Sequence, residues 1–360
     1  MQPLKLGTHT APLPLVQGGM GIGVSLSKLA SSVANEGGIG VLSAAGLGML
    51  YKGSPHYEEN ARDGLRQEIR KTRALSSGVL GVNIMVAMTN FADLVEVAIE
   101  EEIDVIFAGA GLPLDLPKHL PKNHKTKLVP IVSSARAARI ILKKWLQNYD
   151  YLPDGFVLEG PLAGGHLGFK KEQIADPSFT LETLLAEVLT VLRPFEEERK
   201  QAIPVIVAGG IYTGEDIFRF LQRGAAAVQM ATRFVTTHEC DADDAFKASY
   251  IQANADDIVI IDSPVGLPGR AIDNAYLEDV RQGLKHPFTC PYDCIITCKK
   301  EAAPYCITLA LLQARKGNFK HGFAFAGANA YRATEVISVK TLIETLKDEY
   351  AVAAQSSDPS

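Results

Sequence analysis

The chain has 360 residues, with 36 lysines and arginines against 41 aspartates and glutamates, so its formal net charge is −5 at pH 7. It has no surplus of positive charge to neutralise a phosphate backbone, and nucleic acid is not expected as a partner. Apolar residues make up 47% and charged residues 21% of the chain, which is typical of a globular protein with a large core and excludes a disordered one.

The first residues lack a basic start followed by a long apolar stretch, and no run of about 18 apolar residues occurs anywhere. These features predict a protein without a secretion signal and without a membrane partner. The five cysteines are too few for a disulfide framework in a chain of this size, which favours a reducing cytoplasm. The oligomeric state is left open, a homodimer included.

Short β-branched apolar runs alternate with longer amphipathic stretches from the start of the chain to about residue 235. Eight strands are predicted, at 14–17, 39–43, 80–84, 104–108, 128–132, 155–159, 204–208 and 226–230. The main helices predicted between them span 27–36, 57–75, 91–102, 135–149, 181–198 and 214–223. Strands that alternate with helices in this number predict an α/β fold, a (β/α)₈ TIM barrel.

The alternation stops after residue 236, where an acidic helical segment, a loop rich in glycine and proline, and a group of cysteines follow. We expect a smaller, mainly helical domain at 237–324, inserted on the substrate side of the barrel and carrying the cysteines. The barrel itself is expected at 1–236 and 325–350, with a last helix over 336–346. The tail after residue 350 is small and polar and is expected to fray.

Glycines lie within or directly after five of the predicted strands. In a parallel barrel these strand ends meet at one mouth, and glycines there let a ligand approach the backbone closely. The glycine-rich strand ends are 18–23, 81, 109–111, 160–168 and 209–210. Together they favour a large, flat ligand that lies across the mouth.

The loops after the seventh and eighth strands are where barrels commonly bind phosphate. Gly209 and Gly210 follow the seventh strand, and Gln229, Met230 and Thr232 lie at the end of the eighth. By contrast, the glycines of the run GGMGIG at 18–23 are not spaced as in a dinucleotide-binding Rossmann motif. The sequence therefore predicts a phosphate-bearing ligand but disfavours a Rossmann domain.

His166 is the candidate catalytic residue. An imidazole can donate or accept a proton near neutral pH, and the flanking glycines leave its ring open to the mouth of the barrel.

The cysteines at 290, 294, 298 and 306 follow the pattern C-x3-C-x3-C-x7-C. Such a cluster could bind zinc or an iron–sulfur cluster, but the spacing matches neither paired zinc-binding cysteines nor ferredoxin patterns. Buried, inert thiols are the favoured interpretation, and no metal ligand is assigned.

Six segments, taken in order, resemble one known family. They are PLVQGGMG at 14–21, GVNIMV at 81–86, VLEGPLAGGHLG at 157–168, IPVIVAGGI at 203–211, GAAAVQMATRF at 224–234 and SPVGLPGRAI at 263–272. The chain resembles the nitronate monooxygenases, formerly called 2-nitropropane dioxygenases, which share their fold with flavin-dependent enoyl-acyl-carrier-protein reductases.

The resemblance implies an FMN-binding TIM barrel with a small helical domain closing over the flavin. Gly18, Gly19 and Met20 would lie along the flavin ring, with Asn83 and Gly165 beside it. The FMN phosphate would be held by Gly209, Gly210, Met230 and Thr232.

His166 matches the family's catalytic histidine and would supply positive charge or a hydrogen bond beside an anionic nitronate. FMN would accept an electron from the nitronate, and dioxygen would complete its conversion to a carbonyl compound and nitrite.

Two other functions stay open at this point. One is an FMN-dependent NAD(P)H reductase of enoyl thioesters or quinones, since FMN itself carries the electron chemistry. The other is a redox sensor in which the cysteine cluster, with or without a metal, is the working part and the flavin barrel is its scaffold.

Overall fold

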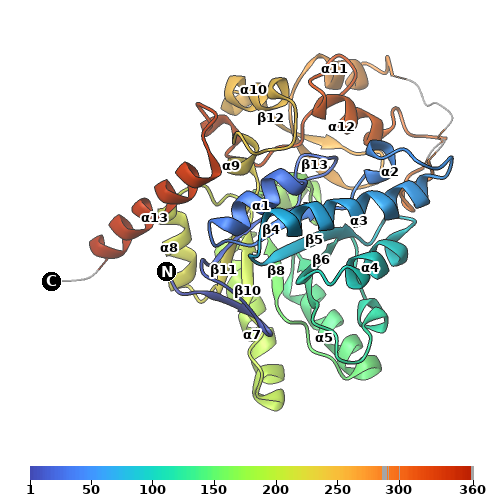
Figure 1. Ribbon diagram of the computed structural model, residues 1–360. Helices are drawn as coiled ribbons and strands as arrows, with labels where there is room; N and C mark the ends of the chain where they lie inside the picture. The colour runs from blue at the N-terminus through green and yellow to red at the C-terminus, as the bar shows by residue number, and fades with distance from the viewer. Residues whose placement is uncertain (286–289, 291, 300, 358–360) are drawn as a thin grey trace.

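A computed structural model describes residues 1–285, 290, 292–299 and 301–357. At its centre is a sheet of eight parallel strands (Figure 1). The strands are β3 (Leu15–Gln17), β4 (Gly40–Ser43), β5 (Leu80–Met85), β6 (Val105–Gly109), β7 (Lys127–Val132), β8 (Phe156–Glu159), β10 (Val205–Ala208) and β11 (Ala227–Met230). Their order is β3-β11-β10-β8-β7-β6-β5-β4, and a parallel bridge between Val16 and Ile39 joins the two outer strands. The predicted eight-stranded barrel is confirmed, and each strand lies within one or two residues of its predicted bounds.

The inside of the barrel is filled by side chains. Val41, Phe107, Val157 and Ile206 are at most 1% exposed there and form one cluster. An N-terminal hairpin of β1 (Leu4–Leu6) and β2 (His9–Ala11), which the sequence pattern did not predict, adds Leu4 and Leu6 to this cluster. The interior is therefore a packed core, and only the C-terminal ends of the strands are open to a ligand.

Helices surround the sheet and bury their apolar faces against it. The longer ones are α1 (Ser27–Asn35), α3 (Tyr57–Leu75), α4 (Phe91–Glu100), α5 (Ala135–Tyr149), α7 (Leu181–Arg199) and α8 (Gly214–Gln222). Shorter elements are α2 (Leu47–Leu50), η1 (Leu116–His119), α6 (Lys171–Ile174) and α9 (Thr232–Val235). Ser134 and Thr213 begin α5 and α8 by accepting hydrogen bonds from backbone N–H groups of the first turn, as N-cap residues do.

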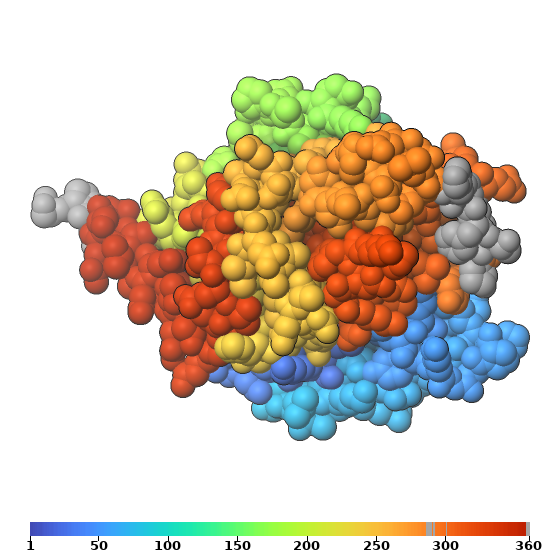
Figure 2. Space-filling view, turned by 90° about the horizontal axis from the view of Figure 1, so that it is seen from above, coloured from blue at the N-terminus to red at the C-terminus, as the bar shows by residue number. Residues whose placement is uncertain are grey.

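The segment after α9 lies over the mouth of the barrel, and Figure 2 shows it covering the face seen from above. Its elements are α10 (Asp244–Gln252), η2 (Ala255–Asp257), β12 (Ile258–Asp262), β13 (Pro268–Ile272), α11 (Ala275–Arg281), α12 (Ile307–Arg315) and η3 (Ala330–Arg332). The antiparallel hairpin of β12 and β13 was not predicted. It pairs with β9 (Gly165–His166), a two-residue strand in the loop after β8, and this three-stranded unit is called the small sheet below.

The last helix, α13 (Val339–Ser356), packs against α8 and extends to one side of the molecule (Figure 1). It continues ten residues beyond the predicted end at 346, so residues 351–356 are helical and the expected fraying of this part was wrong. Ser338 caps its start, and the Glu349 carboxylate accepts a 2.6 Å hydrogen bond from the Gly214 N–H. No helix among the described residues is long and apolar enough to cross a membrane.

Candidate active site

A cavity of about 510 Å³ opens where the parallel strands end, between the barrel and the segment that covers it. This volume lies in the range of small-molecule sites. All eleven residues predicted to bind a cofactor or to act in catalysis line this one cavity. They are Gly18, Gly19, Met20, Asn83, Gly165, His166, Gly209, Gly210, Gln229, Met230 and Thr232. What each of them binds stays a prediction.

The barrel side of the cavity is built largely from backbone. We call it the cavity floor and define it by Gly18, Gly19, Asn83, Gly209 and Gly210. A Cβ atom on Gly19 would lie 2.5 Å from the Cβ of Asn83, so a side chain at position 19 would displace Asn83.

The buried Gln17 side chain holds the first loop of the cavity floor in place. Its amide nitrogen donates a 2.6 Å hydrogen bond to the Gly18 carbonyl, and its oxygen accepts one of 3.1 Å from the Val41 N–H. The Gly18 N–H in turn donates to the Met230 carbonyl at 2.9 Å. The loop after β3 is therefore tied to both neighbouring strands.

The loop after β10 forms the other end of the floor. Gly209 and Gly210 have φ angles of 97° and 83°, which favour glycine, and a Cβ on Gly209 would come within 2.9 Å of the Gly160 carbonyl oxygen. The Asn329 amide donates a 2.7 Å hydrogen bond to the Gly210 carbonyl. Thr232 Oγ1 accepts a 3.2 Å hydrogen bond from the Gly327 N–H, which leaves the hydroxyl hydrogen available to a ligand.

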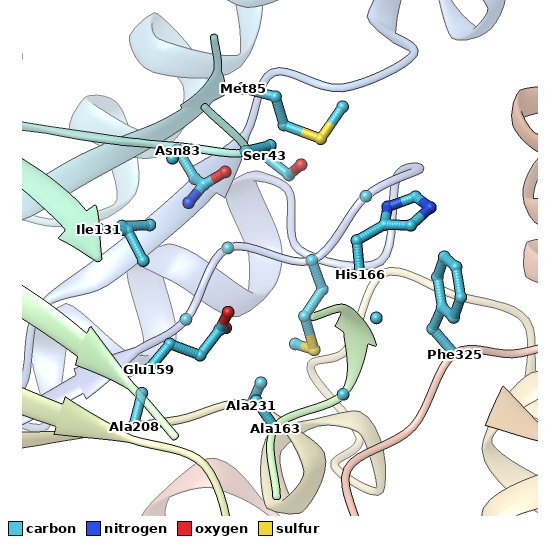
Figure 3. A pocket seen from close by; sticks show the side chains of 18 of the residues that line it. Ser43, Asn83, Met85, Ile131, Glu159, Ala163, His166, Ala208, Ala231 and Phe325 are labelled. Carbon is cyan, nitrogen blue, oxygen red and sulfur yellow. The ribbon is translucent and has the colours of Figure 1, made fainter. Parts of the chain in front are cut away.

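His166 lies on the opposite side of the cavity, in β9 (Figure 3). We call this side the cavity roof, formed by His166, Leu267 and Phe325. The His166 ring meets the Phe325 ring edge-on at 5.0 Å between centroids, and its Nε2 lies 2.7 Å from the Ser263 hydroxyl oxygen. Desolvation by burial lowers the pKa of His166 to about 4, so the imidazole is neutral at pH 7. From the sequence, His166 was expected to supply either a positive charge or a hydrogen bond. Because the imidazole is neutral, it can supply the hydrogen bond but not the charge.

Glu159 is a candidate functional residue that the sequence analysis did not select. It is the last residue of β8, and its side chain reaches into the cavity (Figure 3). No described residue forms a hydrogen bond or an ion pair with its carboxyl group, and desolvation raises its pKa to about 7. The sequence did contain a signal for this residue. Glu159 is the one acidic residue in an otherwise apolar predicted strand, and it stands at the strand end that faces the barrel mouth.

Arg270 stabilises the loop that leads to His166 through hydrogen bonds to its backbone. Its side chain is 6% exposed, and its Nη1 donates hydrogen bonds to the carbonyl oxygens of Pro161, at 2.7 Å, and Ala163, at 2.5 Å. Desolvation lowers the pKa of this guanidinium to about 10, so it stays charged at pH 7. Arg270 belongs to the segment SPVGLPGRAI, which the sequence analysis quoted without giving its residues a role.

The remaining walls are mostly apolar, with Met85, Met88 and Ile131 among them. Three leucines at the cavity edge stay exposed to solvent: Leu112 at 38%, Leu162 at 46% and Leu267 at 37%. Exposed apolar side chains beside a cavity are typical of a binding site for a ligand with an apolar part.

The cysteine segment reaches the same cavity through Cys294, whose sulfur lies 3.3 Å from Thr308 Oγ1. Burial raises the pKa of the Cys294 thiol to about 11, so it is protonated at pH 7 and is a poor nucleophile and metal ligand. Within the described ranges, no three histidine, cysteine, aspartate or glutamate side chains gather as metal ligands.

Comparison with known proteins identifies the family and the fold. The family model for nitronate monooxygenase matches residues 2–349. FabK from Thermotoga maritima superposes with a TM-score of 0.74 at 27% sequence identity, covering 96% of this chain and 95% of that one.

Two relatives carry different names. The (3aS,4S,5R,7aS)-5-hydroxy-7a-methyl-1-oxo-octahydro-1H-indene-4-carboxyl-CoA dehydrogenase of Mycobacterium tuberculosis is 30% identical over 270 residues, which cover 75% of this chain. The match spans 66% of that relative, slightly less than two thirds of its length. A protein of Staphylococcus aureus named "Probable nitronate monooxygenase" is 25% identical over 305 residues, covering 75% of this chain and 78% of the relative.

Proposed function

The chain belongs to the nitronate monooxygenase family of flavin-dependent oxidoreductases, and on this basis we propose that it binds FMN and oxidises alkyl nitronates with dioxygen to a carbonyl compound and nitrite. The observation that carries the proposal is the position of His166, which faces a floor of exposed backbone across one cavity. A flat cofactor on that floor would lie next to the only histidine of the described chain that lines the cavity.

The cavity floor fits FMN. A Cβ at position 19 or 209 would collide with Asn83 or Gly160, so both loops present backbone without a side chain, which would let a planar ring and a phosphate approach closely. Gly18, Gly19, Met20 and Asn83 would hold the ring, with Gln229 and Gly165 beside it. Gly209, Gly210, Met230 and Thr232 would hold the phosphate. When bound, FMN supplies the electron acceptance that no side chain of the protein can provide.

His166 would orient the substrate. Because its imidazole is neutral, it offers one N–H donor and one acceptor nitrogen, and a nitronate oxygen is a strong acceptor for such a donor. The apolar walls exclude water from this contact and thereby strengthen it. With its pKa raised to about 7, Glu159 would be fully protonated only below neutral pH, and there it would add no negative charge that repels an anionic substrate.

The proposal is tested by mixing FMN-loaded protein with propionate 3-nitronate, first without oxygen while the flavin absorbance is followed, and then in air. We expect loss of the oxidised flavin band in the first experiment, and oxygen uptake with nitrite release in the second. Absence of both would overturn the proposal.

A second candidate is oxidation or reduction of a thioester substrate with the same flavin. The three exposed leucines at the cavity edge favour it, since they offer apolar surface beyond what a small nitronate needs. The name of the Mycobacterium tuberculosis relative points to an acyl-CoA substrate as well. Anaerobic loss of the flavin band with NADH or NADPH, and none with the nitronate, would select the reductase.

A further inference from the structure

His166 is connected to Ser263, a residue 97 positions away, through the small sheet. In this sheet His166 pairs with Gly269 of β13, and the Leu167 N–H donates a 2.9 Å hydrogen bond to the Pro268 carbonyl. The strand that carries His166 and the hairpin that carries Ser263 are therefore held in one register. The contact between their side chains follows from this pairing.

The turn that carries Ser263 is tightly constrained. The Ser263 N–H donates to the Leu267 carbonyl at 3.1 Å, and the Gly266 N–H donates to the Ser263 carbonyl at 3.0 Å. Pro264, at the second position of this turn, has a restricted φ angle. Ser263 itself is only 7% exposed. Its hydroxyl is thus presented to His166 from a fixed backbone position.

The hydrogen positions follow from counting donors and acceptors. Ser263 Oγ has two neighbours among the described residues, His166 Nε2 at 2.7 Å and the Val265 N–H at 3.4 Å. The backbone N–H of Val265 can only donate, so the hydroxyl hydrogen has a single acceptor within reach, His166 Nε2. In a neutral imidazole the nitrogen that accepts a hydrogen bond is the one without hydrogen. When the Ser263 hydroxyl uses this one acceptor, the hydrogen of the His166 ring lies on Nδ1.

We propose that Ser263 is a positioning residue that fixes His166 as the tautomer with its hydrogen on Nδ1, so that this nitrogen presents an N–H donor to the cavity. Nδ1 has no hydrogen-bond partner among the described residues and is free for a substrate oxygen. The Phe325 ring packs edge-on against the imidazole and limits its rotation. The consequence for turnover rests on the proposed function, whereas the tautomer itself does not.

The test measures the tautomer by NMR, through the ¹⁵N chemical shifts of ring nitrogens in protein labelled with ¹⁵N-histidine. The His166 signals are identified by their loss in His166→Gln. In the unsubstituted protein and in Ser263→Thr, which keeps the hydroxyl, we expect the hydrogen on Nδ1. In Ser263→Ala we expect a mixed population or the opposite tautomer. Hydrogen on Nε2 in the unsubstituted protein, or an unchanged tautomer in Ser263→Ala, would overturn the proposal.

Kinetic measurements give a second readout. Ser263→Ala should lower kcat/KM for the nitronate by about 10- to 100-fold, the scale on which groups that orient a functional histidine act. Because the hydroxyl stabilises the neutral ring, its loss should also move the acidic limb of the pH profile of kcat/KM to higher pH. Ser263→Thr should restore both. A loss of activity that Ser263→Thr fails to restore, with no shift of the acidic limb, would argue against a positioning role.

A matched control separates this effect from general damage. Ser178→Ala removes an exposed hydroxyl that, among the described residues, donates only to the Asp176 carboxylate, and it should leave the His166 tautomer, the pH profile and the thermal unfolding unchanged. If the unsubstituted protein shows the Nδ1 tautomer but no activity with the nitronate, the proposed function fails while the assignment of Ser263 stands.

Discussion

The two sides of the cavity are built in different ways. The cavity floor consists mainly of backbone from loops that follow parallel strands, and its glycines at 19 and 209 pack too closely against Asn83 and Gly160 to accept a side chain. The cavity roof consists of side chains, chiefly His166 from the small sheet and Phe325, which lies next to that sheet through a bridge to Ala271. A backbone surface selects a ligand by shape and by N–H and carbonyl groups, whereas a side chain such as imidazole can also donate or accept a proton. Cofactor binding and catalysis should therefore respond to separate substitutions.

The largest effect is expected on the roof. His166→Ala removes the polar group that faces the substrate, so turnover with propionate 3-nitronate should fall by about 10²- to 10⁴-fold. The FMN content should stay at the level of the unsubstituted protein, because no floor residue changes. Steady-state oxygen uptake and the flavin absorbance of the purified variant measure the two quantities.

The matched control is His321→Ala, which alters an exposed histidine outside the cavity and should change neither quantity. Unchanged turnover in His166→Ala would remove this residue from the mechanism. Loss of FMN in that variant would show that the two sides of the cavity are not separable.

A smaller effect concerns Glu159, at the barrel end of the cavity. Its carboxyl ionises near pH 4.5 in the unfolded chain and near pH 7 in the folded one, so the folded state binds more protons between these values. Stability must therefore fall as the pH rises from 4.5 through 7. Glu159→Gln removes this loss because the amide does not ionise. The free energy of unfolding of the variant, relative to that of the unsubstituted protein, should therefore be higher at pH 8.5 than at pH 5, by up to about 2 kcal/mol.

Urea unfolding of the FMN-free protein at the two pH values measures this difference. Glu335→Gln, at an exposed glutamate, is the control and should show no comparable pH dependence. If Glu159→Gln changed the free energy of unfolding by the same amount at both pH values, Glu159 would ionise normally in the cavity.

The smallest effect is expected from a substitution at Gly209. It separates the cost of backbone strain from a change in the shape of the cavity floor. Gly209→Ala and Gly283→Ala both put a side chain at positive φ, 97° and 70°, which costs roughly 1–2 kcal/mol in each case. At Gly209 the new Cβ would lie 2.9 Å from the Gly160 carbonyl oxygen, whereas at Gly283 it would meet no atom of the described residues within 4 Å. Gly209→Ala should thus weaken FMN binding by about tenfold or more, and Gly283→Ala should not weaken it.

Fluorescence titration with FMN measures the dissociation constants, and thermal unfolding compares the strain of the two variants. Equal FMN affinity in both would place the phosphate away from the loop after β10.

The barrel was predictable because its signals are local. The strands at 80–84 and 128–132 are short apolar runs, and the helices at 57–75 and 135–149 begin and end at the residues that the pattern predicted. The unpredicted elements depend on distant partners. The strand β9 has only two residues, Gly165 and His166, and it exists because β13, about a hundred residues later, pairs with it. The end of α13 was missed for a different reason: Ala351 and the residues after it are small or polar and lie largely exposed beyond the buried part of the helix.

The sequence by itself determined the barrel, the glycine loops at its mouth and the choice of His166, because strand period, helix period and the backbone freedom of glycine are properties of neighbouring residues. Only the tertiary structure decided the chemical state of the cavity. Burial lowers the pKa of His166 and raises that of Glu159, and both shifts arise from desolvation by segments far apart in the chain. The hydrogen bond from Ser263 to His166 likewise requires the small sheet, which joins the barrel loop to the hairpin over it.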